Sequence, residues 1–158
     1  MIIVAAMTRK RIIGKNNQLP WDIPEEMKHF RSLTKGGICI MGRRTFESIG
    51  SKPLPNRKLI VVSHSLGPVE GVDVCKTVEE AVKKAKSYDG PIFILGGAQI
   101  YEKTIPIADK MYISYIKKGY EGDTYFPEFD EDDWKVERRE DHQDFEFVVY
   151  ARKKGDEC

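Results

Sequence analysis

Residues 19–30 read Leu-Pro-Trp-Asp-Ile-Pro-Glu-Glu-Met-Lys-His-Phe, and they place a carboxylate on the apolar side of a helix that follows a loop with proline and tryptophan. Pro24 suits the first position of a helix. Glu26 lies in the first turn, one turn before Phe30. The pattern predicts a helix over residues 24–34, with a buried stripe at the helical spacing of Met27, Phe30, Leu33 and Thr34.

The position of Glu26 allows two interpretations. A carboxyl group that is removed from water has a raised pKa, so Glu26 could stay protonated near neutral pH or exchange hydrogen bonds with a polar ligand. Alternatively, Glu26 could, like Glu25, only complement the positive end of the helix dipole. The helix alone favours neither interpretation, because acidic residues are common in first turns.

The composition describes a globular chain without a strong overall charge. It has 158 residues, of which 41% are hydrophobic and 32% are charged, so it is long enough to bury a core as one domain. Lys and Arg number 26 and Asp and Glu number 25, which gives a formal net charge of +1. We therefore expect neither nucleic acid nor membrane as a partner, and any anion site must be local.

The cysteines and the lengths of the apolar runs indicate where in the cell the protein is expected. Three cysteines without a Cys-x-x-Cys spacing argue against a disulfide framework and a zinc site, so we expect no metal. Apolar runs such as residues 92–95 are too short to span a membrane, and residues 1–7 lack the basic lead-in of a secretion signal. We expect a cytosolic protein with a flexible polar tail after Lys153.

Apolar runs bounded by turn residues alternate with helical patterns along the chain. Short helices are expected near residues 45–48 and 98–103, and a capping box at residues 77–80 opens another helix. Strands are expected over residues 2–6, 38–41, 59–62, 72–75, 92–95 and 110–116, followed by an antiparallel edge hairpin of residues 134–139 and 145–152 around the polar link 140–144. The alternation indicates a single α/β domain over residues 1–158, with a mostly parallel sheet covered on both faces.

Two glycine-containing turns lie between an expected strand and an expected helix. The turn Leu95-Gly96-Gly97-Ala98 would let a ligand approach free backbone N–H groups, which suits a phosphate, although a Gly-Gly pair alone is most often a plain turn. The chain contains neither Gly-x-Gly-x-x-Gly nor a P-loop motif, which counts against both standard nucleotide sites.

The second turn, Met41-Gly42-Arg43-Arg44-Thr45, adds two guanidinium groups and a hydroxyl at a helix start, and Ser63-His64 at another strand end offers further donors. A dianionic ligand would relieve the repulsion between the two arginines, whereas a plain interpretation is a solvated surface pair. Strand ends of a parallel sheet meet at one edge, so three donor-rich ends fit an extended phosphorylated cofactor. Arg57 could clamp a carboxylate, whereas His29 and His142 have no partner that suggests nucleophilic catalysis.

These motifs together resemble the dihydrofolate reductase family, in the right order along essentially the whole chain. The matching pieces are Ile-Ile-Gly before Leu-Pro-Trp, Met-Gly-Arg-x-Thr-Phe-Glu-Ser-Ile-Gly, Pro-Leu-Pro-x-Arg, Gly-Gly-x-x-Ile-Tyr and Glu-Gly-Asp-Thr-x-Phe-Pro. The resemblance implies an eight-stranded, mostly parallel sheet with about four flanking helices and a C-terminal antiparallel strand. It also implies NADPH-dependent reduction of 7,8-dihydrofolate to tetrahydrofolate in one-carbon metabolism, with hydride transfer to pterin C6 and protonation at N5.

The resemblance assigns roles to particular residues. Glu26 matches the acid that bonds the pterin amidine edge and promotes N5 protonation, with Trp21, Leu19 and Ser114 as the other catalytic-site residues. The implied substrate contacts are Val4, Ala5, Glu26, Met27, Phe30, Arg31, Ile49, Leu54, Arg57, Leu95 and Ser114. The implied cofactor contacts are Ala6, Ile13, Gly14, Asn17, Gln18, Leu19, Gly42, Arg43, Arg44, Thr45, Ser63, His64, Lys76, Gly96, Gly97, Ala98, Gln99, Ile100, Tyr101 and Asp123.

Within those lists, the resemblance gives several residues a more specific task. Arg57 matches the clamp on the glutamate α-carboxylate, and Ser63 and His64 match the 2′-phosphate site that selects NADPH over NADH. Residues 16–19 match a mobile loop that closes over the nicotinamide, and Asp123 would brace that loop. Antifolate inhibitors are expected ligands, and the protein is expected to be a monomer.

Four positions depart from the family pattern. Glu26 stands where many bacterial relatives carry Asp, Ser114 where Thr is usual, Leu19 where Met is frequent, and His64 where Arg or Ser is common. Ser114 keeps the hydroxyl but loses the methyl that restricts its rotamer, and His64 could make the preference for NADPH depend on pH. We expect these changes to tune rate and inhibitor affinity.

Two other functions remain open from the sequence. A related pterin or pyrimidine reductase on the same fold would share the cofactor residues but would not need Glu26 together with Arg57. A nucleotide-binding module without chemistry would use the glycine turns alone, with Glu26 only a helix-end charge.

Overall fold

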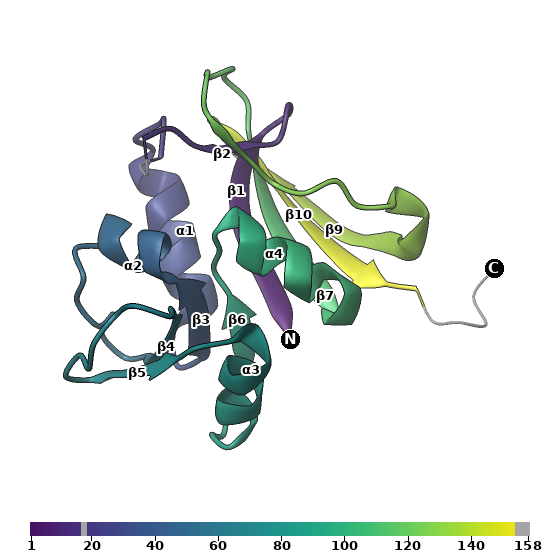
Figure 1. Ribbon diagram of the computed structural model, residues 1–158. Coiled ribbons are helices and arrows are strands. Elements are labelled where there is room, and N and C mark those ends of the chain that lie inside the picture. Colours follow the sequence, from purple (N-terminus) through teal and green to yellow (C-terminus); the bar gives the residue numbers. More distant parts are fainter. Residues whose placement is uncertain (17–18, 154–158) are drawn as a thin grey trace.

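The computed structural model describes residues 1–16 and 19–153, which form an eight-stranded sheet flanked by helices (Figure 1). The strand order is β5-β4-β3-β6-β1-β7-β10-β9, and β10 is antiparallel to both of its neighbours. The expected mostly parallel sheet with an antiparallel C-terminal strand is thus confirmed. The strands are β1 (Ile2–Thr8), β3 (Ile38–Gly42), β4 (Lys58–Val62), β5 (Val72–Cys75), β6 (Ile92–Ile94), β7 (Lys110–Ile116), β9 (Trp134–Asp141) and β10 (Phe145–Arg152).

The described residues form four α-helices, of which α1 has the predicted bounds. Its first turn begins at Pro24 after an extended Ile23. At the start of α3, the Thr77 hydroxyl accepts a hydrogen bond from the Glu80 N–H at 3.1 Å, as the capping box predicted. The Glu80 carboxylate in turn accepts a hydrogen bond from the N–H of Lys76. The helices are α1 (Pro24–Thr34), α2 (Arg43–Ser48), α3 (Val78–Lys86) and α4 (Ala98–Thr104), and 3-10 turns span Ile105–Ile107 and Glu131–Asp133.

A second sheet of two short strands was not predicted. It pairs β2 (Ile12–Gly14) with β8 (Thr124–Tyr125) in antiparallel fashion. Strands of two or three residues are too short to show an alternating pattern, which explains why the sequence did not reveal them. The pairing carries the loop between β7 and β9 to the end of β1 (Figure 1).

The alternation of side chains along the strands separates two faces of the sheet. On one face, Ile3 of β1 and Ile40 of β3 pack in one cluster with Ala81 of α3 and Ile100 of α4. On the other face, α2 packs against Val4 and its strand neighbours. Figure 1 shows α4 in front of β1 and β7. Both faces are therefore covered, as a parallel sheet requires.

A split between β1 and β6 opens the sheet at one point. The two strands pair at Ile2 with Phe93 and at Ile3 with Ile94, and β6 then ends, whereas β1 continues along β7 as far as Thr8. The chain after β6 therefore turns away from residues 4–6 of β1. Ligands of open α/β sheets bind at such places outside the carboxyl ends of the strands.

The C-terminal hairpin is longer than predicted. Strand β9 continues to Asp141, so the link between β9 and β10 shortens to residues 142–144, and the His142 N–H donates to the Phe145 carbonyl across it at 2.9 Å. The predicted tail beyond Lys153 lies outside the described residues. Among those residues, none of the helices has the length and apolar character needed to cross a membrane.

Candidate active site

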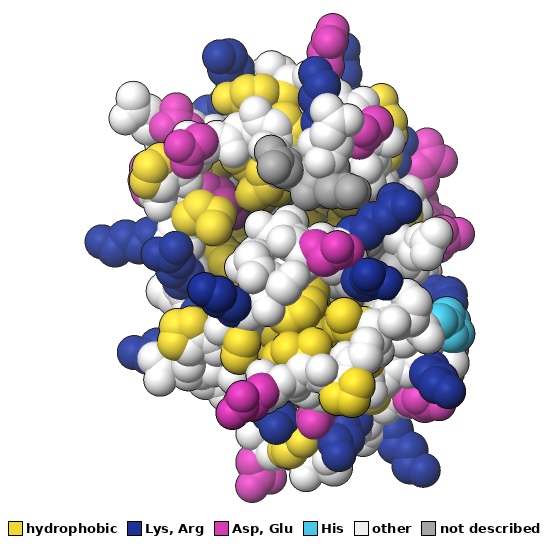
Figure 2. Space-filling view, turned by 60° about the vertical axis from the view of Figure 1, so that its left-hand side comes forward, with side chains coloured by type: hydrophobic (Ala, Val, Ile, Leu, Met, Phe, Trp, Pro, Cys, Tyr) yellow, Lys and Arg dark blue, Asp and Glu magenta, His cyan; other side chains and the backbone are white. Residues whose placement is uncertain are grey.

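A cleft of about 700 Å³ follows the split in the sheet. Residues 4–6 of β1 form one wall, and the turn at residues 95–99 after β6 faces them. Figure 2 shows hydrophobic side chains in the hollowed middle of this face, with Lys, Arg, Asp and Glu side chains around it. One end of the cleft is lined by α1 and the other by the first turns of α2, α3 and α4, so its two ends offer different chemistry.

The α1 end contains a buried carboxyl group. Glu26 lines the cleft and its side chain is only 6% exposed. Loss of water raises the pKa of Glu26 from its ordinary value of 4.5 to about 7, although the Ser114 hydroxyl, which can donate a hydrogen bond to the carboxylate, lowers it. Glu26 is therefore a carboxyl group that can be protonated at neutral pH, and the interpretation as a helix-end charge alone is insufficient.

Apolar groups and two polar groups surround the acid. Met27 and Phe30, which lie on α1 with Glu26, line the same cleft. The Tyr101 hydroxyl is buried and donates to the Val4 carbonyl at 2.8 Å, and burial raises the pKa of Tyr101. Val4 was predicted as a substrate contact, and its carbonyl has a second lone pair besides the one that Tyr101 uses. Trp21 Nε1 is buried without a hydrogen-bond partner in the described part of the chain.

At the other end, three helix N-termini face the cleft. Gly42 precedes α2, Gly97 precedes α4 and Thr77 precedes α3, and all three line the cavity. Each N-terminus presents unpaired backbone N–H groups and a partial positive charge. Gly96 has a φ of +112°, and a Cβ there would lie 3.1 Å from the Tyr101 ring, so this turn requires glycine. The arrangement suits phosphate groups.

Cationic side chains add to the positive potential of that end, but Arg43 and Arg44 differ. Arg43 pairs with Glu47 at 3.5 Å and donates to the Ser65 hydroxyl. The two arginines are therefore not equivalent, because Glu47 one turn along α2 pairs with Arg43 and not with Arg44. Arg44, His64 and Lys76 line the cleft without an ion-pair partner among the described residues.

Ser63 has a fixed orientation beside His64. Its hydroxyl oxygen accepts hydrogen bonds from the N–H groups of Ser65 at 3.2 Å and Leu66 at 3.0 Å. The hydroxyl proton is not used in these bonds and can donate into the cleft, which Ser63 and His64 both line.

Arg57 lies beside the C-terminal end of α1. Its guanidinium donates to Thr34 Oγ1 at 2.8 Å, to the Pro55 carbonyl at 2.6 Å and to the Arg31 carbonyl. These three bonds use Nε and one N–H from each terminal nitrogen. Each terminal nitrogen keeps a second N–H, so the anchored fork can still bind a carboxylate with two hydrogen bonds.

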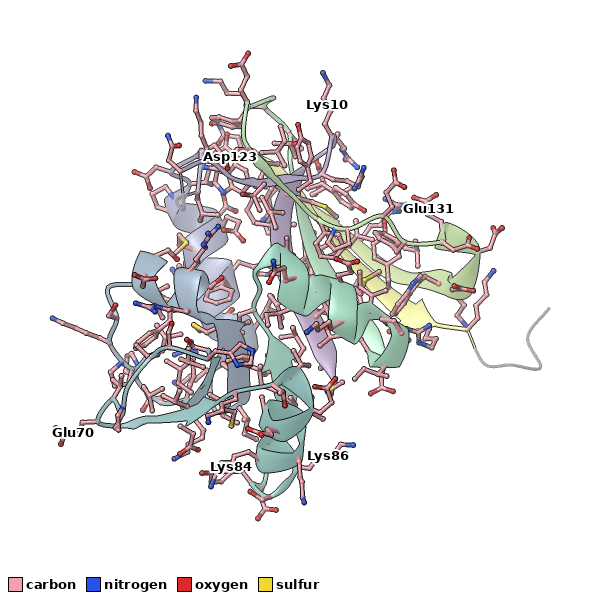
Figure 3. The ribbon with its side chains drawn as sticks, viewed as in Figure 1. Lys10, Glu70, Lys84, Lys86, Asp123 and Glu131 are labelled. Carbon is pink, nitrogen blue, oxygen red and sulfur yellow. The ribbon has the colours of Figure 1, made fainter. Side chains whose placement is uncertain are left out.

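Asp123 connects the small sheet to the loop after β2. Its carboxylate accepts from the Asn16 N–H at 3.0 Å and from the Thr124 hydroxyl at 2.9 Å, and these bonds lower the pKa of Asp123. Figure 3 shows Asp123 at the top of the molecule, above β1. Leu19 lines the cleft and is 47% exposed, while the predicted contacts Asn17 and Gln18 lie outside the described residues.

The cleft brings together most of the predicted site residues. Those that line it are Val4, Ala5, Ala6, Ile13, Gly14, Leu19, Glu26, Met27, Phe30, Gly42, Arg43, Arg44, Thr45, Ile49, Ser63, His64, Lys76, Leu95, Gly97, Ala98, Gln99, Ile100 and Tyr101. Predicted residues that lie outside the lining are Trp21, Arg31, Leu54, Arg57, Gly96, Ser114 and Asp123. Trp21 and Ser114 are buried behind the cleft wall, whereas Arg31 is exposed on the outer face of α1.

Sequence reasoning missed several lining residues. They are Ser48, Val62, Thr77, Val78, Glu79, Lys103 and Thr124. The capping box at residue 77 was recognised as a helix start but not as part of the site. It follows the end of a parallel strand, as the other two phosphate-type turns do, and that position was the available signal.

Comparisons with known proteins agree with one another. The family model described as dihydrofolate reductase matches residues 1–152. The chain is 42% identical to a dihydrofolate reductase of Bacillus subtilis, over 95% of this chain and 93% of the relative. It is 39% identical to a dihydrofolate reductase of Haemophilus influenzae, over 96% of this chain and 98% of the relative.

A solved structure has the same fold. It is a dihydrofolate reductase from Enterococcus faecalis complexed with NADP(H) and RAB-propyl. The TM-score is 0.89 with 33% sequence identity, over 97% of this chain and 96% of that chain.

Replacement of Glu26 by Gln should change how stability depends on pH. The folded state holds the proton more tightly than the unfolded state, so wild-type stability should fall as pH rises from 4.5 to about 7. From about pH 5 to pH 8, the free energy of unfolding of Glu26→Gln should rise relative to wild type by up to about 3 kcal/mol.

Urea unfolding at both pH values measures this difference. The exposed Glu102 of α4 gives a matched control, since Glu102→Gln should follow wild type at both pH values. Parallel curves for wild type and Glu26→Gln would show that burial does not perturb the carboxyl group.

Proposed function

This chain belongs to the dihydrofolate reductase family, and from that premise we propose that its cleft reduces 7,8-dihydrofolate to 5,6,7,8-tetrahydrofolate with NADPH. The observation that carries the proposal is the desolvated Glu26 in a cleft whose far end is lined by helix N-termini. The first feature suits a flat nitrogen heterocycle that must gain a proton, and the second suits a phosphorylated cofactor.

Glu26 acts on the pterin in this proposal. Its carboxyl group bonds the amidine edge of the ring, and its protonated form promotes protonation at N5, with a water molecule supplying the proton. A pKa of about 7 leaves a substantial fraction protonated at neutral pH. Ser114 approaches the same carboxyl group and orients it, and the apolar Met27 and Phe30 keep the surroundings dry.

The far end of the cleft fits NADPH, which supplies the hydride for pterin C6 when it is bound. Backbone N–H groups at the start of α2 and α4 would hold the pyrophosphate, with Arg44 and Thr45 beside them. Ser63, His64 and Lys76 would hold the 2′-phosphate, since they offer a hydroxyl proton, an imidazole and an ammonium group at one strand edge.

Two groups outside the cleft lining support the bound molecules. Arg57 would clamp the α-carboxylate of the folate tail with its two remaining N–H groups. Asp123 would hold the start of the loop at residues 16–19, because it already accepts from the Asn16 N–H.

The setting of the enzyme is part of the proposal. One chain supplies every residue assigned to the site, so we propose an active monomer. The free thiols of Cys39 and Cys75 suit the reducing conditions of the cytoplasm. Antifolate inhibitors that mimic the pterin should compete for the Glu26 end of the cleft.

Hydride transfer should depend on Glu26. Wild-type protein mixed with NADPH and dihydrofolate should lose nicotinamide absorbance, and the rate should fall as pH rises through about 7, because the protonated acid is depleted. Glu26→Gln should cut the rate at neutral pH by about two orders of magnitude or more and leave NADPH affinity nearly unchanged.

Stopped-flow kinetics and NADPH titration measure the two quantities, with Glu102→Gln as the control that should keep the wild-type rate. An unchanged rate in Glu26→Gln would remove this residue from the mechanism. NADPH binding without turnover by the wild type would leave only a binding module.

Arg57 should act on the tail of the substrate and not on its ring. Arg57→Ala should weaken folate binding by roughly 1.5–3 kcal/mol, the range for a hydrogen bond to a charged group. Arg57→Lys should recover only part of that loss, because an ammonium group cannot form the two-bond fork.

Equilibrium titration with folate and with a pterin that lacks the glutamate tail separates the two roles. The short pterin should bind wild type and both variants equally. An equal loss for both ligands would contradict the tail clamp and would indicate that Arg57 only supports the end of α1.

A further inference from the structure

Outside the cleft, α1 and the β9–β10 hairpin bring two histidines and a glutamate together. His29 lies on α1, Glu140 near the end of β9, and His142 in the link to β10. One possible ligand atom from each residue lies within 4.8 Å of the others. None of the three residues lines the cleft, so the proposed reductase activity makes no use of them.

The hydrogen bonds of His142 leave one of its ring nitrogens available. Its Nδ1 lies 2.9 Å from Glu25 Oε1, so in a neutral imidazole an N–H on Nδ1 donates to that carboxylate and the lone pair remains on Nε2. Histidines that bind metals almost always hold their second ring nitrogen in this way, against a carboxylate or carbonyl oxygen. Glu25 therefore selects the tautomer that can act as a ligand.

The free nitrogen of His142 faces a carboxylate oxygen. Nε2 lies 3.6 Å from Glu140 Oε1, and it is buried without a hydrogen-bond partner among the described residues. Two lone pairs that face each other repel, and a cation between them removes the repulsion. Two ligands of a tetrahedral zinc ion, each about 2.0–2.1 Å from the metal, lie about 3.3–3.4 Å apart, close to the spacing seen here.

His29 of α1 is the third side chain of the group. Its Nδ1 is also buried without a partner in the described part of the chain. Its ring packs edge-on against the Phe147 ring, with 4.4 Å between the ring centroids. The His142 ring stacks on the Phe145 ring, with 4.3 Å between the centroids and an interplanar angle of 9°. The aromatic contacts fix both imidazoles before any ion arrives, which reduces the cost of binding.

Charged side chains surround the group, and it remains accessible from solvent. Arg138 lies beside the other carboxylate oxygen of Glu140, Oε2, whereas Oε1 faces His142. The side chains of His142 and Glu140 are 23% and 31% exposed, so an ion can enter from solvent and keep a water as a fourth ligand.

We propose that His29, Glu140 and His142 form a zinc site that ties α1 to the C-terminal hairpin. A set of two imidazoles and one carboxylate binds zinc in preference to magnesium or calcium, which favour oxygen ligands. The cysteine spacing led us to expect no metal, and the proposed ligands lie in separate elements that only the fold brings together. The ion would stabilise the helix that carries Glu26 and take no part in hydride transfer.

Titration of ZnCl₂ into metal-free full-length protein tests the site. A Cys158→Ser background keeps the terminal thiol from binding the probe. One equivalent of Zn²⁺ should bind and raise the midpoint of thermal unfolding, and Co²⁺ should give visible absorption bands of a nitrogen-ligated ion, whereas Mg²⁺ should not compete. His142→Ala should weaken Zn²⁺ binding by about 100-fold or more, and Glu25→Gln by about 10- to 100-fold.

His64→Ala removes the third histidine of the chain and is the matched control, which should bind Zn²⁺ as the wild type does. An unchanged circular dichroism spectrum shows that each variant is folded, and Glu25→Gln keeps all three proposed ligands if the alanine variants do not fold. Equal affinity in wild type, His142→Ala and Glu25→Gln, or loss of binding in His64→Ala, would overturn the proposal and leave an ion-pair cluster.

Discussion

The central constraint in this protein is a carboxyl group, that of Glu26, which the fold removes from water. Glu26 occupies a buried position of α1 that an apolar residue would fill at no electrostatic cost. Burial raises its pKa to about 7, so the free protein loses stability at neutral pH by keeping an acid there. Proteins keep a residue that lowers their stability where a ligand or a reaction needs that residue. A neutral acid beside a nitrogen heterocycle is a use that fits this cost.

The rest of the fold places three helix N-termini at the other end of the cleft that contains the acid. β1 and β6 pair over only two residues and then separate, so the cleft begins at the centre of the sheet and not at its edge. The carboxyl ends of the neighbouring parallel strands lead into three helix N-termini along the same line. One end of the cleft therefore holds a buried acid among apolar side chains and the other holds helix N-termini and cationic side chains, which suits a heterocycle at one end and phosphates at the other.

Local patterns predicted what depends on neighbours in sequence. The bounds of α1 followed from Pro24 and the helical spacing of apolar residues, which are patterns within a few residues. The same spacing put Glu26 on the apolar side of the helix but left open whether its carboxyl group is removed from water. The β2–β8 pair was missed because strands of two and three residues carry no periodicity. The ion pair of Arg43 with Glu47 is local, but the sequence pattern does not show which rotamer Arg43 adopts. The approach of His29 to His142 depends on how α1 packs on the hairpin, and no local pattern encodes it.

The ionisation of Glu26 in the ligand-free protein tests the account most directly. NMR spectroscopy of the glutamate carboxyl carbons, with the Glu26 signal assigned by its loss in Glu26→Gln, gives the midpoint of this titration. The account predicts a midpoint of about 7, well above the ordinary value of 4.5. A midpoint near 4.5 would mean that the carboxylate is solvated, and it would contradict the central claim.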